Sequence, residues 1–287
     1  MLTETFRSIV TATRNVFRNW SAMLLIAAVY ASLLALLYLV VSIREATLAQ
    51  VTLTFTFAVA LPLLFFVLQA MIASSSARQL AGENTTQTDQ VTAGLVLKRS
   101  LASFWKVILI SLPLIALAIL IWYLLARAQN HFGQNINDPV INTPHPLATT
   151  ANAQHPARPV DWRVALFSTL RYLSFGLLLP LVAIHLWLAT VRDGLAGAIR
   201  KIVTLLSRAF APQSVLTYIA GFLIFAVVPY FLLFKTMQTK HAWLELSLLV
   251  ARLAVVFALT LIGWMITVHA LAHLSTRRST EPATETT

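Results

Sequence analysis

The sequence contains no cysteine and few charged residues. The lack of cysteine excludes disulfide bonds, iron–sulfur clusters and cysteine-ligated zinc. Charged residues make up 11% of the chain, against about 25% in an average soluble domain, while 58% of the residues are hydrophobic. A soluble core cannot hide so many apolar side chains beneath so little polar surface. The composition therefore predicts an integral membrane protein.

Acidic residues are also scarce. The chain has 10 Asp and Glu against 21 Lys and Arg, which gives a formal net charge of +11. In a soluble protein this charge would suggest nucleic acid as a partner. Here the basic residues lie beside long apolar segments, which favours anionic lipid headgroups. We therefore expect membrane lipids as partners, and no nucleic acid.

The motifs of common enzyme classes are missing as well. The sequence has no Walker motif, no glycine-rich phosphate loop and no GxSxG motif. His269 and His273 are four residues apart, with His185 as a third candidate metal ligand, but no acidic residue accompanies them. This favours contacts with headgroups or backbone carbonyls. We therefore expect no catalytic residues, no metal, no cofactor and no enzymatic activity.

Six long apolar segments predict an all-α fold with six transmembrane helices. About 20 residues of helix match a hydrocarbon core of about 30 Å. The predicted spans cover 21–41, 51–72, 107–126, 170–190, 214–234 and 250–271, within a single membrane domain over residues 1–274. Polar residues over 128–163 predict a flexible external loop, and residues 275–287 predict a disordered tail.

Proline residues interrupt four of the predicted spans. They are Pro62, Pro113, Pro180 and Pro229. A proline inside a helix removes one backbone hydrogen bond, so we expect a kink near each of these positions.

Three segments, at 2–20, 95–106 and 195–210, combine apolar and basic residues at helical spacing. Such helices lie in the headgroup plane of a membrane, although the first could instead pack on the protein's own helices with its polar face toward water. We expect three helical hairpins, each preceded by one cytoplasmic amphipathic interfacial helix. The basic residues expected to contact lipid or a partner are Arg7, Arg14, Arg18, Lys98, Arg99, Lys106, Arg200, Lys201 and Arg208.

The distribution of basic residues predicts the orientation. If both termini and the even-numbered connections are cytoplasmic, most Lys and Arg residues lie on the cytoplasmic side. This arrangement satisfies the positive-inside rule. We therefore expect a multi-pass protein of the cell membrane with both termini in the cytoplasm.

Two of the basic segments share a pattern with their following spans. The stretches RNVFRNWSAMLLIAAV and LKRSLASFWKVILISL each run from a basic entry through an aromatic residue into an apolar helix. They resemble the six-span membrane domain attached to some bacterial glycerophosphodiester phosphodiesterases, and related bacterial membrane families. The resemblance implies a bacterial inner-membrane protein. The paired carboxylates and histidines of phosphodiesterase chemistry have no counterpart, so it implies nothing catalytic.

These features favour a non-enzymatic scaffold or accessory subunit that engages anionic lipids or a membrane-protein partner. The alternative is a small-molecule or lipid transporter with a cavity between the helical repeats. Arg171, His185 and Arg252 are the candidate cavity residues, because they are polar side chains at the edges of predicted spans or inside them.

Overall fold

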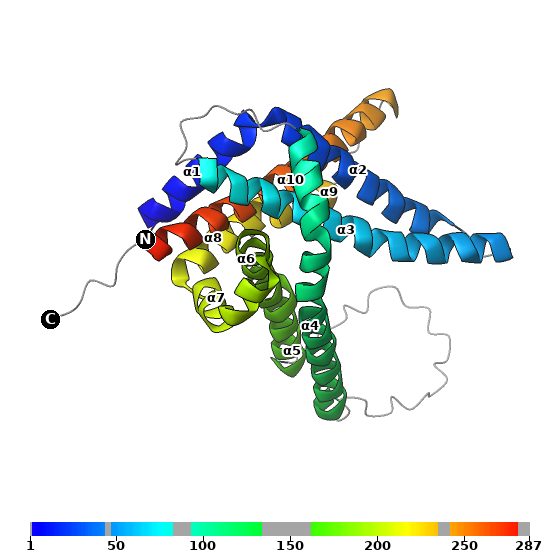
Figure 1. Cartoon of the computed structure of the whole chain (residues 1–287). Coiled ribbons are helices and arrows are strands. Elements are labelled where there is room, and N and C mark those ends of the chain that lie inside the picture. Colours follow the sequence, from blue (N-terminus) through cyan, green and yellow to red (C-terminus); the bar gives the residue numbers. More distant parts are fainter. Residues whose placement is uncertain (1, 44–46, 83–92, 134–161, 235–241, 281–287) are drawn as a thin grey trace, which may run out of the picture. The chain divides into compact units, whose positions relative to one another are not determined.

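The computed structural model describes residues 2–43, 47–82, 93–133, 162–234 and 242–280, and within them every regular element is a helix (Figure 1). The elements are α1 (Leu2–Arg18), α2 (Trp20–Ser42), α3 (Leu48–Gly82), α4 (Ala93–Gly133), α5 (Trp162–Leu173), η2 (Ser174–Leu178), α6 (Leu179–Arg200), α7 (Ile202–Ala209), α8 (Pro212–Phe222), η3 (Leu223–Val227), α9 (Val228–Phe234) and α10 (Ala242–Thr280). The elements η2 and η3 are short π-helical turns. The all-α prediction is confirmed for these residues.

Six helical segments are long and apolar enough to cross a membrane. They are Trp20–Ser42, Leu48–Ala77, Val96–His131, Ala165–Arg200, Pro212–Phe234 and Trp243–Thr276. Each contains one predicted span, so the prediction of a multi-pass membrane protein is confirmed. The longest single helix, α4, has 41 residues. At 1.5 Å per residue it measures about 60 Å, roughly twice the thickness of a hydrocarbon core.

The chain divides into two compact units. The first comprises Met1–Ser111 and Leu181–Thr287, and the second comprises Leu112–Pro180. Both boundaries fall inside helices, α4 and α6. They do not mark a linker between domains, so the single membrane domain predicted over residues 1–274 stays a prediction.

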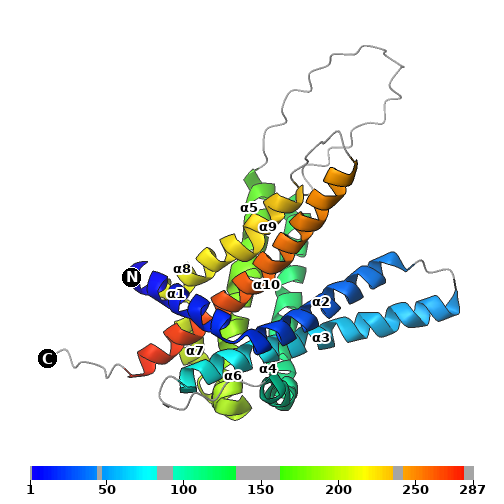
Figure 2. The same cartoon turned by 90° about the horizontal axis from the view of Figure 1, so that it is seen from above.

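α10 is the central helix of the first unit. It packs against α1, α3, α8, η3 and α9, and Figure 2 shows α10 (orange to red) running beside α8 and α9 (yellow). Buried residues gather in its second half, and in the second halves of α3 and of the span that contains α6. These are the second, fourth and sixth spans, which run in the same direction if successive spans alternate. The core is therefore built where their C-terminal halves meet.

Glycine allows α8 and α10 to approach closely. A Cβ atom at Gly221 would overlap the side chain of Thr267, and a Cβ atom at Gly263 would lie 2.9 Å from the Cβ of Phe225. Lipid tails are as apolar as leucine, so close packing between small residues drives much of helix association in membranes. Gly221 therefore allows the close contact of α8 with α10, and Gly263 allows the contact of α10 with η3, to which Phe225 belongs.

Two hydrogen bonds between side chains also join helices of the first unit. The indole Nε1 of Trp264 in α10 donates to Oε1 of Gln69 in α3 at 3.1 Å. The Nε1 of Trp187 in α6 donates to Oγ of Ser111 in α4 at 2.8 Å. Gln69, Ser111 and Trp187 are buried, so these bonds satisfy polar groups that would otherwise be desolvated without a partner.

Irregular helix geometry accompanies two of the four span prolines. Pro180 and Pro229 each follow a π-helical turn at the same spacing, η2 and η3. A proline lacks the N–H group and crowds the carbonyl four residues earlier, and a local π turn accommodates both effects. Pro62 and Pro113 lie within the continuous α-helices α3 and α4.

The structure differs from the sequence prediction at the second basic segment. Residues 95–106 were expected to form a separate surface helix, but they are the first part of α4, which continues unbroken into the third span. Between α1 and α2, by contrast, Asn19 leaves the helical conformation with φ −108° and ψ 63°. The stretch SFWKV at 103–107 has no glycine, proline or asparagine to end a helix.

The ends of two predicted irregular segments are also helical. α4 extends to Gly133 and α5 begins at Trp162, so both ends of the predicted loop at 128–163 are ordered, and residues 134–161 lie outside the described residues. α10 extends to Thr280. The tail predicted from residue 275 is thus helical at its start, and residues 281–287 lie outside the described part of the chain.

Candidate functional site

α1 has one buried face of small residues and one exposed face of bulky ones. Thr5, Ser8, Ala12 and Val16 are buried, and α1 packs against α10 and α8 (Figure 1). Most of the exposed side chains are apolar or basic: Phe6 (70% exposed), Val10, Phe17, Arg7, Arg14 and Arg18 in α1, and Trp20 (57% exposed) at the start of α2. The acidic Glu4 is also exposed, and its Oε2 accepts from Nε2 of Gln213 at 2.7 Å. That this segment lies in the headgroup plane of a membrane stays a prediction. It packs on the protein, and it also presents a basic apolar surface.

The start of α4 also has one buried side and one exposed side with bulky and basic residues. Val96, Ser100, Ser103 and Val107 are buried along one side of the helix. The exposed residues are the bulky Leu97, Leu101 and Trp105 and the basic Lys98, Arg99 and Lys106. A second basic apolar surface is thus formed without a separate helix.

The third basic segment is divided into two short helices. Gly194 has φ 77° and ψ 172° inside α6, and Lys201 interrupts the helix again before α7. Ala198, Leu205 and Ala209 are buried. The exposed residues again include bulky and basic ones: Ile199, Ile202, Val203, Leu206, Phe210, Arg200 and Lys201. The sequence predicted this apolar face but not the breaks at Gly194 and Lys201.

Asp193 connects the parts of this segment across the break at Gly194. Its Oδ1 lies 2.8 Å from Nε of Arg192, and its Oδ2 lies 3.1 Å from Nζ of Lys201. The side chains are partly exposed, so each ion pair contributes at most about 1 kcal/mol to stability. Their main effect is to orient Arg192 and Lys201 around the turn.

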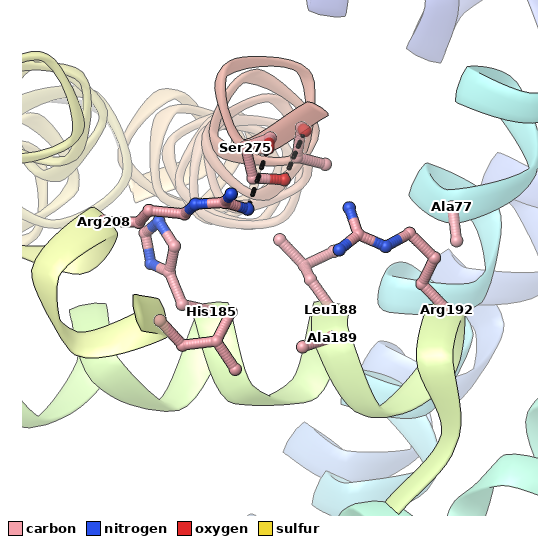
Figure 3. Close-up of a pocket in the computed structure, with 9 residues that line it drawn as sticks. Ala77, His185, Leu188, Ala189, Arg192, Arg208 and Ser275 are labelled. Carbon is pink, nitrogen blue, oxygen red and sulfur yellow. Dashed lines mark hydrogen bonds between the residues drawn. The ribbon is translucent and has the colours of Figure 1, made fainter. Parts of the chain in front are cut away.

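A basic pocket lies beside this turn, within the first unit (Figure 3). Its polar lining residues are His185 and Arg192 of α6, Arg208 of α7 and Ser275 of α10. The remaining lining residues are Ala77, Leu188, Ala189, Leu205 and Ala272. Nη1 of Arg208 donates to the carbonyl oxygen of Ser275 at 3.5 Å. The pocket has a volume of about 20 Å³, enough for one small polar group, since a water needs about 10–15 Å³.

His185 is a buried lining residue of this pocket. The side chain is 2% exposed, and Nδ1 lies 2.9 Å from the carbonyl oxygen of Leu181. A carbonyl only accepts, so Nδ1 must carry the proton that it donates there. In the neutral ring Nε2 is then a hydrogen-bond acceptor, and in the protonated ring it becomes a donor.

The structure does not bring the candidate cavity residues His185 and Arg252 of the first unit together. His185 lines the pocket. Arg252 lies half-buried about 20 residues before Ala272 on α10, which is about 30 Å along a helix. Arg171 belongs to the second unit. The surfaces on α1, α4 and α6–α7 contain eight of the nine predicted contact residues, and the ninth, Arg208, lines the pocket.

The two C-terminal histidines have different surroundings. His269 is buried, with Nδ1 2.8 Å from the carbonyl oxygen of Met265 and Nε2 3.4 Å from Oγ of Ser75. His273 is half-buried one turn later. Within the described residues, no three His, Asp or Glu side chains are grouped in a way that could hold a metal ion.

Sequence reasoning missed the roles of Arg192, Asp193 and Ser275. The one local signal was Gly194 directly after an Arg–Asp pair at the end of a span, which is typical of a turn. Comparison of the chain with protein-family models, curated proteins and solved structures found no match. The resemblance to the phosphodiesterase-associated membrane domain therefore stays an expectation.

Proposed function

We propose that this multi-pass membrane protein is a non-enzymatic scaffold or accessory subunit that engages anionic lipids through basic surfaces. One observation carries the proposal. α1 buries small side chains against the protein and leaves Phe6, Val10 and Phe17 exposed among arginines, and Trp20 is exposed at the start of α2. In water, burying the small side chains and exposing the large apolar ones would leave the larger apolar area unburied, which would make the protein less stable.

At a membrane surface, exposure of the large apolar side chains becomes favourable. The aromatic rings of Phe6, Phe17 and Trp20 would enter the boundary between headgroups and acyl chains. The guanidinium groups of Arg7, Arg14 and Arg18 would meet lipid phosphates, with charge-assisted hydrogen bonds. The starts of α4 and α7 repeat this combination of exposed bulky and basic side chains, so three surfaces support the same function.

The proposed topology places all three surfaces on one side. Both termini would lie in the cytoplasm of a bacterium, and each basic segment would lead into a hairpin of two spans in the inner membrane. The positive-inside rule supports this orientation. The shared pocket at the C-terminal halves of the second, fourth and sixth spans supports only that these three spans run in the same direction.

Neutralising the arginines of α1 is expected to weaken the preference for anionic lipid. The triple variant Arg7→Gln, Arg14→Gln and Arg18→Gln removes three exposed charges. Each is worth about 1 kcal/mol near an anionic surface, so we expect at least about a fivefold lower preference for phosphatidylglycerol over phosphatidylcholine. Native mass spectrometry of the full chain in mixed-lipid nanodiscs would measure it.

A matched control changes the same number of charges elsewhere. Arg127→Gln, Arg171→Gln and Arg252→Gln lie outside the three surfaces, so this variant should retain the lipid preference. An equal loss in both triple variants would show that net charge alone attracts the lipid, and would contradict the proposal.

The transporter function has no comparable support. The pocket of about 20 Å³ holds one small group and not an organic solute. Of the three side chains expected to line a cavity, His185 alone reaches this pocket.

A further inference from the structure

We propose that the pocket between α6, α7 and α10 binds a phosphate monoester group, either of a lipid headgroup or of a soluble phosphate. This site is separate from the basic surfaces of α1 and α4. It therefore goes beyond the proposed engagement of anionic lipid and can fail or stand independently of it.

The arrangement of charge is the first argument. Figure 3 shows the guanidinium groups of Arg192 and Arg208 reaching into the pocket from opposite sides. No Asp or Glu is among the lining residues, all of which belong to the described part of the chain. Two like charges facing one another repel, and an anion between them converts the repulsion into two attractions. Guanidinium groups match the geometry of phosphate oxygens with paired N–H donors.

Arg192 keeps donors available for such a ligand. Its bonds to Asp193 use Nε and Nη2. The guanidinium has five N–H donors, so Nη1 remains for an anion in the pocket. Asp193 also fixes the direction of the side chain, because it holds the guanidinium at two points. The ion pair therefore orients Arg192 and leaves its Nη1 donors for a ligand.

His185 supplies the second, independent argument. It is 2% exposed and lines the pocket, and its Nδ1 is engaged by the Leu181 carbonyl. Nε2 therefore provides a buried polar atom at the pocket. Near neutral pH a phosphate monoester carries a charge of about −1.5 to −2, so it exists in forms with and without a P–OH group. A neutral His185 can accept from the P–OH, and a protonated one can donate to a phosphate oxygen.

The lining and the size of the pocket restrict the ligand further. Leu188, Ala189, Leu205 and Ala272 form apolar walls, which lower the local dielectric constant and strengthen interactions between opposite charges. A volume of about 20 Å³ has room for about one water-sized group, such as one phosphate oxygen, but not for a sugar or a base. The rest of the ligand would have to lie outside the pocket.

Two probes test the site and distinguish the two sources of phosphate. The full chain in detergent is titrated with inorganic phosphate at constant ionic strength, by calorimetry. The full chain in nanodiscs is offered phosphatidic acid, a monoester, against phosphatidylglycerol, a diester, by native mass spectrometry. In Arg192→Gln and Arg208→Gln we expect the affinity for the probe that binds to fall at least tenfold. Arg127→Gln, an exposed basic residue outside the pocket and outside the three basic surfaces, should bind as the parent does.

Each outcome decides the proposal. Binding of phosphate alone, of phosphatidic acid alone or of both supports it and identifies the source, provided the pocket variants lose binding and Arg127→Gln does not. Arg192 is one-third exposed, so Arg192→Gln remains a test if Arg208→Gln fails to fold. The absence of binding by both probes, or an equal loss in Arg127→Gln, would overturn it. The triple variant of α1 should keep phosphate binding, which separates this result from that of the lipid surface.

Discussion

Replacing Gly221 with alanine is expected to lower the free energy of unfolding by about 1–3 kcal/mol, the usual cost of an overpacked contact. The new Cβ would overlap the Thr267 side chain. Thr267 is buried, and its hydroxyl donates to the Gly263 carbonyl at 2.7 Å, so it has little freedom to move aside. α8 and α10 would have to separate. Unfolding of the full chain in mixed micelles of increasing SDS content would measure the change.

The chain offers a matched control and a rescue for this prediction. Nothing lies within 4 Å of a Cβ at Gly94, so Gly94→Ala should leave stability within about 0.5 kcal/mol. Adding Thr267→Ala to Gly221→Ala removes two of the three overlapping atoms and should restore part of the stability. If Gly221→Ala unfolded at the same SDS content as Gly94→Ala, the close contact of α8 with α10 would be refuted.

Gly194→Ala is expected to destabilise the turn that forms the basic pocket. Gly194 has φ 77° and ψ 172°, a region accessible to glycine and costing other residues about 1–3 kcal/mol. No neighbouring atom lies within 4 Å of the new Cβ, so the cost arises in the backbone. An alanine favours continuation of the α6 helix through residue 194, which would move α7 and Arg208. We expect lower stability and at least a tenfold loss of affinity for the phosphate probe.

Two measurements on Gly194→Ala separate its effects. SDS unfolding reports the strain, and titration with the probe reports the position of Arg208. Gly94→Ala again serves as the control for the exchange of glycine by alanine, and it should bind as the parent does. Unchanged stability would contradict the left-handed turn. Reduced stability with unchanged affinity would show that the turn does not position Arg208.

The six spans followed from the sequence because spanning a membrane is a local requirement. About 20 consecutive apolar residues satisfy it, and every predicted span lies inside one apolar helical segment of the structure. Hydrophobicity did not fix the helix bounds, because a helix does not end where its apolar character ends. Residues 95–106 are more polar than the third span, yet they are part of α4, since no residue at their junction with the span favours a break.

The basic surfaces could be predicted in part, because the spacing of residues along one helix is also a local property. The spacing of Phe6, Val10 and Phe17 marks one face of a helix in any context. The opposite face of α1 was not recognised as a contact, because Thr5, Ser8 and Ala12 carry little hydrophobic signal. Their value lies in their small size, which matters when another helix lies against them.

The pocket depended on contacts between distant parts of the chain. His185, Arg208 and Ser275 are separated by tens of residues, and no spacing rule connects them. The sequence by itself determined which segments cross the membrane and which faces are basic, because hydrophobicity and charge act along each helix separately. The tertiary structure decided that α10 lies at the centre, that Gly221 meets Thr267 and that two arginines share one pocket. Between helices in lipid the hydrophobic effect does not select a partner, so shape and buried polar groups make that selection.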